Sequence, residues 1–231
     1  MSNKTNIVLV HGAWGDGGHW RKVLPILKAA GHTVVATQNP LTSLTDDAEV
    51  TRRMAEWLEG PTILVGHSYG GAIITEAAGK CPNVTGLVYI AAFAPDTNEN
   101  LGGLLARTAP PPGAAALRPD KYGNLWIDRA QFHANFCQDL SEEDAYVMQA
   151  AQKPTSGKCF EQKPTNAAWK DLPTWYQVSD NDRMIPPDTE KWFAERMKAT
   201  TIHLPAGHAS MASHPEEVAE LIQKAAAASY K

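Results

Sequence analysis

The chain has 231 residues, of which 43% are hydrophobic, and a formal net charge of −4. This length and apolar content suffice for a full core, which excludes a disordered chain or a disulfide-stapled miniprotein. The acidic balance argues against a nucleic-acid partner, and the apolar runs are too short for a membrane span or a signal-peptide core. We therefore expect one soluble, cytoplasmic domain over residues 1–231 that binds a small molecule, and the sequence leaves its oligomeric state open.

Short β-branched runs alternate with helical stretches along the chain. Strands are predicted at residues 7–10, 33–37, 62–65, 86–91, 175–178 and 201–204. Helices are predicted at residues 20–30, 46–59, 70–80, 189–198 and 215–228. Several of the strand segments are apolar on both faces, as in a parallel sheet covered by helices. The alternation predicts an α/β fold with a central, mostly parallel sheet of about six strands flanked by helices.

Residues 94–172 interrupt this alternation. Three consecutive prolines begin at Pro110, helical patterns follow at residues 129–137 and 142–152, and no strand is expected in the segment. An insertion between two strands commonly covers the sheet edge at which a site lies. The segment therefore predicts a helical lid, with an ordinary surface excursion as the alternative.

A serine lies between a predicted strand and a predicted helix. The sequence around Ser68 is TILV-GHSYGG-AIITEAA, so glycines flank the serine where the chain must turn sharply. A G-x-S-x-G motif in this strand–turn–helix context is typical of a nucleophile elbow. The alternative is a glycine-rich turn with an incidental serine, for which the placement of the motif gives no support.

A serine nucleophile needs a base and an acid that orients the base. His208 follows the last predicted strand and should lie at the same sheet edge as Ser68. Asp182 and Asp180 follow the preceding predicted strand, and Asp96 follows the one before the insertion. The order Ser68, Asp182, His208 matches the order of nucleophile, acid and base found with this elbow. The sequence favours Asp182 and leaves the other two as alternatives.

The loop at residues 11–18, HGAWGDGG, contains four glycines after the first predicted strand. Its backbone, with the amide of Tyr69, is suited to bind the oxyanion of a tetrahedral intermediate. A phosphate-binding loop is the alternative, but neither G-x-x-x-x-G-K-[ST] nor G-x-G-x-x-G is present. Such chemistry requires no metal or organic cofactor, and we expect neither.

Four segments together resemble the α/β-hydrolase superfamily: VLVHGAWGDGGHW, VGHSYGG, VSDNDRMIPP and LPAGHASMASHPEEVAELI. The chain is similar to the group of small plant methylesterases and hydroxynitrile lyases and to its bacterial relatives. The resemblance implies an α/β-hydrolase fold with a helical lid insertion at about residues 94–172. It also implies Ser68 as nucleophile, Asp182 as acid and His208 as base, with the amides of Ala13 and Tyr69 as oxyanion donors.

Two departures narrow the expected activity. Hydroxynitrile lyases of this group have a lysine directly after the histidine, where this chain has Ala209, which argues against cyanohydrin cleavage. Dehalogenases and epoxide hydrolases have an aspartate nucleophile, and dienelactone hydrolases a cysteine, where this chain has Ser68.

We therefore expect a serine esterase that cleaves a small, largely apolar carboxylic ester through an acyl-enzyme. The alternatives are a C–C bond hydrolase, a lactonase or a perhydrolase with the same triad, or a ligand receptor with little turnover. Aromatic residues near the elbow and in the insertion are candidates for the substrate pocket: Trp14, Trp126, Phe132, Phe136 and Trp169.

Overall fold

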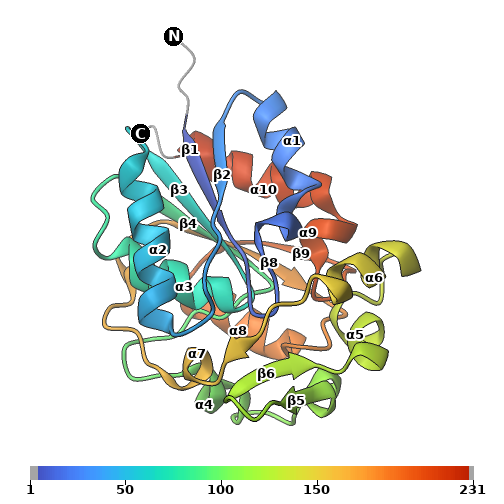
Figure 1. The fold of residues 1–231 in the computed structure, drawn as a ribbon. Helices are drawn as coiled ribbons and strands as arrows, with labels where there is room; N and C mark the ends of the chain where they lie inside the picture. The colour runs from blue at the N-terminus through green and yellow to red at the C-terminus, as the bar shows by residue number, and fades with distance from the viewer. Residues whose placement is uncertain (1–4, 229–231) are drawn as a thin grey trace.

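A six-stranded sheet crosses the computed structural model, which describes residues 5–228 (Figure 1). Its strands are β1 (Asn6–Val10), β2 (Thr33–Ala36), β3 (Thr62–His67), β4 (Val84–Ile90), β8 (Thr174–Ser179) and β9 (Thr200–Leu204). The spatial order is β2-β1-β3-β4-β8-β9, and every neighbouring pair is parallel. The prediction of about six mostly parallel strands is confirmed.

The central strands β1 and β3 are buried along their whole length, whereas the edge strand β9 is largely exposed. Their apolar runs need cover on both faces, and helices supply it. The helices are α1 (Val23–Ala29), α2 (Leu44–Trp57), α3 (Tyr69–Ala78), α8 (Pro187–Arg196), α9 (Ser210–Ser213) and α10 (Pro215–Ala228), and a 3₁₀ helix, η1 (Gly17–Trp20), precedes α1.

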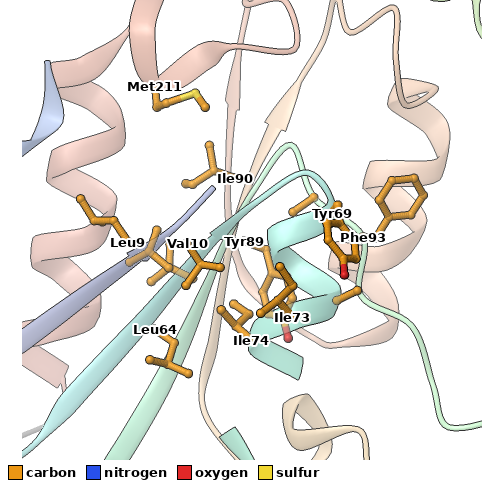
Figure 2. Close-up of a cluster of buried hydrophobic side chains, with 14 of the residues drawn as sticks. Leu9, Val10, Leu64, Tyr69, Ile73, Ile74, Tyr89, Ile90, Phe93 and Met211 are labelled. Carbon is orange, nitrogen blue, oxygen red and sulfur yellow. The ribbon is translucent and has the colours of Figure 1, made fainter. Parts of the chain in front are cut away.

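Two helix layers enclose the sheet. Helices α2 and α3 pack on each other and against β1, and α1 packs on α10, which contacts β3, β4 and β8. Figure 2 shows the resulting buried side chains, in which Val10 from the sheet lies beside Ile74 of α3, while Leu9 points to the opposite face of the sheet. This packing fixes the carboxyl ends of the strands, where the candidate site lies.

The insertion at residues 94–172 lies beyond the carboxyl ends of the strands, coloured green to yellow in Figure 1. Its helices are α4 (Leu101–Leu105), η2 (Pro112–Ala116), α5 (Arg129–Phe136), α6 (Glu142–Ala150), α7 (Lys158–Glu161) and η3 (Ala168–Lys170). Its strands are β5 (Leu117–Pro119), β6 (Asn124–Ile127) and β7 (Thr155–Ser156), which form an antiparallel sheet.

The expectation that this insertion contains no strand was wrong. Its strands have two to four residues, too few to show an alternating pattern in the sequence. The turn between β5 and β6 is stabilised by Asp120, whose Oδ1 accepts hydrogen bonds from the amides of Tyr122 and Asn124 at 2.8 and 2.9 Å. Gly123 supplies the positive φ of +83°. The DKYGN segment was therefore a hairpin signal.

The insertion is hydrogen-bonded to the loop that follows β1. The amide of Lys153 donates to the Trp14 carbonyl at 3.0 Å, and the Trp14 amide donates to Thr155 Oγ1 at 2.9 Å. The insertion therefore fixes the backbone of a loop beside the elbow. In the described part of the chain, no helix is long and apolar enough to cross a membrane.

Candidate active site

Ser68 lies at the turn between β3 and α3 with φ 54° and ψ −123°. A positive φ is unfavourable for a residue with a side chain, so the surrounding structure must hold this conformation. The Ser68 carbonyl accepts from the amides of Gly71 and Phe93 at 3.0 and 3.1 Å, and the Ser68 amide donates to the Ile90 carbonyl at 3.2 Å. The strained turn is thus fixed from both sides.

Two glycines allow this turn to pack closely. A Cβ on Gly66 would lie 2.5 Å from the carbonyl oxygen of Gly70, and a Cβ on Gly70 would lie 2.5 Å from that of Val10. Both contacts are with backbone atoms, which cannot move aside as a flexible side chain could. The G-x-S-x-G pattern therefore has a direct steric cause here.

The three residues proposed for a triad converge at the carboxyl edge of the sheet. The Ser68 Oγ lies 2.9 Å from His208 Nε2, and His208 Nδ1 lies 2.6 Å from Asp182 Oδ2. The side chains of His208 and Asp182 are fully buried, and Ser68 is 5% exposed. The geometry suits proton transfer from the hydroxyl to the imidazole, with Asp182 orienting the ring.

The turn after β8 holds the Asp182 carboxylate in place. Its second oxygen, Oδ1, accepts from the amides of Met184 and Ile185 at 2.6 and 2.9 Å. Hydrogen bonds to both oxygens leave the carboxylate little freedom to rotate.

The two alternative acids lie elsewhere. Asp180 is exposed, and its Oδ1 lies 3.1 Å from Nδ1 of His203. The carboxylate of Asp96 lies 2.6 Å from the ammonium of Lys170. Neither alternative acid is within hydrogen-bond distance of the His208 ring.

A second histidine supports the His208 backbone. His67 is fully buried, its Nε2–H donates to the His208 carbonyl at 2.8 Å, and the two rings are 4.7 Å apart. Burial lowers the pKa of His67 well below its ordinary value, so the ring is neutral. Phe136 packs edge-on against His208 at 5.0 Å. Apart from the Asp182 carboxylate, these neighbours of His208 carry no charge.

The amides of Ala13 and Tyr69 are free to bind an anion. Within residues 5–228, no protein group accepts a hydrogen bond from either amide. The neighbouring Trp14 amide is already used by Thr155. Tyr69 is also the first residue of α3, where helical amides have no partner within the helix. Two unpaired donors thus lie beside Ser68, as an oxyanion hole requires.

The Tyr69 side chain helps to fix the position of the Tyr69 amide. Its hydroxyl donates to Asp47 Oδ2 at 2.7 Å, and Asp47 Oδ1 accepts from the Leu41 amide at 2.8 Å. Burial raises the pKa of Asp47 to about 6, although these hydrogen bonds act against that shift. Sequence reasoning missed Asp47, because an aspartate in the first turn of a predicted helix needs no other explanation.

A small apolar cavity of about 70 Å³ opens beside Ser68. No charged side chain lines it. Its other lining residues are Ala13, Trp14, Phe93, Leu105, Pro111, Ala114, Leu117, Leu125, Phe160, Met184 and Ile185. About half of these come from the insertion. The cavity suits an apolar group of a substrate whose reacting carbon lies at Ser68.

Of the five predicted pocket residues, Trp14 lines this cavity, and the other four do not. The Trp126 Nε1 donates to Asp120 at 3.0 Å on the other face of β6, and the Trp169 Nε1 donates to the Pro95 carbonyl at 3.0 Å. Phe132 and Phe136 are fully buried and stack at 4.9 Å. Phe132, Phe136 and Trp169 are buried core residues, as large apolar side chains commonly are, whereas Trp126 is only partly buried.

The missed lining residues are mostly aliphatic. Some come from the insertion, and Phe93, Met184 and Ile185 come from the loops after β4 and β8. Phe160, from the insertion, is aromatic. It follows the buried Cys159 in α7, and its ring lies 5.9 Å from that of Trp14. No local sequence signal distinguishes such residues from ordinary core positions.

The remaining nucleophilic and metal-binding groups are scattered. The three cysteines are free and buried. In residues 5–228, no three histidine, cysteine, aspartate or glutamate side chains converge on a point where a metal ion could bind.

Residues 7–221 match the model of the alpha/beta hydrolase family. The chain belongs to the alpha/beta hydrolase family. A carbendazim hydrolyzing esterase of Nocardioides sp. is 28% identical to it, over 93% of this chain and 97% of the relative. An alpha-hydroxynitrile lyase of Arabidopsis thaliana is 25% identical, over 94% of this chain and 95% of the relative.

The crystal structure of a pyrethroid hydrolase from Sphingobium faniae superimposes with a TM-score of 0.86 and 26% identity, covering 97% of this chain and 98% of that one. These similarities confirm the expected relationship to plant methylesterases and hydroxynitrile lyases and to bacterial hydrolases. All are distant relatives, so they identify a hydrolase fold with esterases among its relatives and leave the substrate open.

Proposed function

We propose that this hydrolase is a serine esterase that cleaves small, largely apolar carboxylic esters. The observation that carries the proposal is the continuous hydrogen-bonded chain from Asp182 through His208 to Ser68 beside an uncharged cavity. The names of two relatives, the carbendazim hydrolyzing esterase and the pyrethroid hydrolase, support the same reaction class. The cytoplasmic location stays a prediction from the sequence.

The first half-reaction forms an acyl-enzyme. The Ser68 oxygen attacks the ester carbonyl carbon while its proton passes to His208 Nε2. The carbonyl electron pair moves onto oxygen, and the amides of Ala13 and Tyr69 stabilise that negative charge. The imidazolium, held by Asp182, then protonates the leaving oxygen as the ester C–O bond breaks and the alcohol departs.

The second half-reaction restores the enzyme. His208 takes a proton from water, whose oxygen attacks the acyl carbon, and the same two amides bind the second oxyanion. When this intermediate collapses, the bond between the acyl carbon and Ser68 breaks, and His208 returns the proton to the serine oxygen. The products are the free acid and the unmodified enzyme.

Turnover of p-nitrophenyl esters from acetate to octanoate tests the proposal. Ser68→Ala should lower kcat at least about 10⁴-fold, because the attacking atom is removed. Ser213→Ala is the matched control, since that hydroxyl is partly exposed and contacts His214. Turnover retained in Ser68→Ala would refute the mechanism. If wild type cleaves no ester, the same site favours a lactone, C–C bond or peracid reaction, or a receptor with little turnover.

A further inference from the structure

A second buried carboxyl lies behind the proposed triad, and the mechanism above gives it no role. Glu190 in α8 is fully buried, and its Oε2 accepts from the amide of Ser179 at 2.9 Å. Ser179 is the last residue of β8, at the start of the turn that contains Asp182. The Oε1 of Glu190 is buried without a hydrogen-bond partner among the described residues, and the Asp182 carboxyl is close enough to act on it electrostatically.

Two ionised carboxylates this close together at a buried site would repel each other strongly, so one must carry a proton. Asp182 receives two backbone amides and the His208 Nδ1. Glu190 receives a single amide, and its Oε1 has no hydrogen-bond donor among the described residues. The donor set therefore stabilises the charge on Asp182 and leaves the proton with Glu190.

The surroundings of Glu190 favour the same assignment. Burial, followed by the charge of Asp182, holds the pKa of Glu190 well above its usual range, and Asp180 acts in the same direction. Tyr176 is the other titratable group that faces it, and burial keeps this phenol neutral. His208 is separated from Glu190 by Asp182.

We propose that Glu190 is a positioning residue that stays protonated and donates a hydrogen bond from its carboxylic acid to Asp182. This role rests on the proposed function, because Asp182 must first act on His208. The acid fixes the Asp182 carboxylate in rotation and, through Ser179, ties α8 to the turn. It also withdraws charge from Asp182 without adding a second negative charge near the imidazole. No proton leaves Glu190 during the reaction.

Two substitutions distinguish the effect of a hydrogen-bond donor at position 190 from the effect of a negative charge there. Glu190→Gln replaces one neutral donor by another, and kcat should stay within about threefold of wild type. The midpoint of the acid limb in the pH profile of kcat/KM should stay within about 0.3 pH units of the wild-type midpoint, because no charge changes near His208. Glu190→Met fills the volume without a donor, and kcat should fall about 10- to 100-fold at a temperature where the fold is intact. Glu195→Gln, at an exposed position of the same helix, is the matched control.

Two kinetic outcomes would overturn the proposal. If Glu190 is ionised in the wild type, Glu190→Gln removes a negative charge, and the acid limb should move to lower pH by about one unit or more. If Glu190 only supports the fold, Glu190→Met should lower the melting temperature and leave kcat of the folded enzyme unchanged.

Infrared difference spectroscopy gives a readout that does not depend on turnover. At pH 8, the wild type minus Glu190→Gln spectrum should contain the C=O stretch of a protonated carboxylic acid, and the Glu195→Gln difference should lack it. Absence of that band overturns the inference even if the enzyme is an active esterase. Presence of the band in a protein without ester turnover would refute the proposed function alone.

Discussion

Two regions of the molecule meet at Ser68, and they contribute different groups. The sheet edge, defined as the loops after β1, β3, β8 and β9, supplies every polar group in reach of the nucleophile, including Asp182 and His208. The insertion at residues 94–172 supplies only apolar side chains to the cavity. The difference indicates that the sheet edge determines which chemical steps are available, while the insertion, together with apolar residues of the sheet edge such as Trp14 and Met184, shapes the space beside Ser68.

The two regions are also held in place differently. The groups of the sheet edge are fixed by strand ends and by buried backbone hydrogen bonds. The insertion is joined to the rest of the fold by scattered backbone hydrogen bonds, such as that from the Lys153 amide to the Trp14 carbonyl, and by partly exposed ion pairs, such as that between Arg196 and Glu99 at 2.8 Å. The insertion should therefore tolerate changes of shape that the sheet edge does not.

The largest expected effect comes from the sheet edge, where replacement of the proposed acid, Asp182, should lower kcat. In Asp182→Asn, the side-chain oxygen should stay with the amides of Met184 and Ile185, so the NH2 group faces His208 Nδ1. That group cannot accept from Nδ1–H or stabilise the imidazolium, so kcat should fall about 10⁴-fold. Asp180→Asn is the matched control two residues away, and it should change kcat less than about twofold because that carboxylate is exposed. Equal losses in both variants, measured on one ester with both proteins folded, would contradict the assignment of Asp182.

The sequence was most informative where the chemistry is local. The elbow, the turn with Asp182 and the loop with His208 each follow a strand that its apolar run identifies, and parallel strands bring such loops to one edge. It was least informative in the insertion. There, strands of two to four residues carry no periodic signal, and pocket residues such as Leu125 and Phe160 look like any core residue.

Two buried acids illustrate a second limit of prediction from the sequence. Asp47 and Glu190 both lie in the first half of a helix, where acidic residues are common. Their partners, Tyr69 and Asp182, are distant or unrelated by any motif, so only the tertiary fold shows the contacts. Sequence patterns predict the residues that act directly and miss those that hold them.

The stability of the sheet edge should depend on pH more than that of the insertion. Burial lowers the pKa of His11 to about 4, that of His19 to about 3 and that of His67 well below its ordinary value. All three belong to the sheet edge or to η1 beside it, whereas His133 of the insertion is only half-buried. These histidines bind protons in the unfolded chain and not in the folded one.

The folded pKa values are depressed, so the stabilisation is present above pH 6.5 and is lost as the pH falls toward 4. At pH 5, each such histidine should lower the free energy of unfolding by about 2 kcal/mol relative to its value above pH 6.5. Asp47, with a pKa raised to about 6, acts in the opposite direction as it takes up a proton below that pH. Glu190, which we propose stays protonated, also acts in that opposite direction, because the folded chain holds a proton that the unfolded chain releases at these pH values. Urea unfolding should therefore show a net fall of about 1 kcal/mol between pH 7.5 and pH 5.

Two histidine variants locate this effect. His19→Gln should flatten the dependence of the unfolding free energy on pH, because one buried site no longer titrates. His203→Gln should leave it unchanged, since that ring is about half exposed. A pH dependence that stays as steep in His19→Gln as in wild type would show that the sheet edge is not the acid-sensitive region.

The smallest expected effect comes from the insertion, where two neighbouring residues of β6 give a matched pair. Leu125 lines the cavity, whereas Trp126 points to the other face of the strand, as alternate residues do. Leu125→Ala enlarges a cavity of about 70 Å³ and should shift the ratio of kcat/KM for octanoate over acetate about 10-fold toward octanoate. Trp126→Ala should leave that ratio within about twofold of wild type.

An equal shift in both variants would mean that general loosening of the insertion, rather than the shape of the cavity wall, selects the acyl chain. A shift only in Leu125→Ala, with kcat on acetate nearly unchanged, would place selectivity in the insertion and leave the chemistry to the sheet edge.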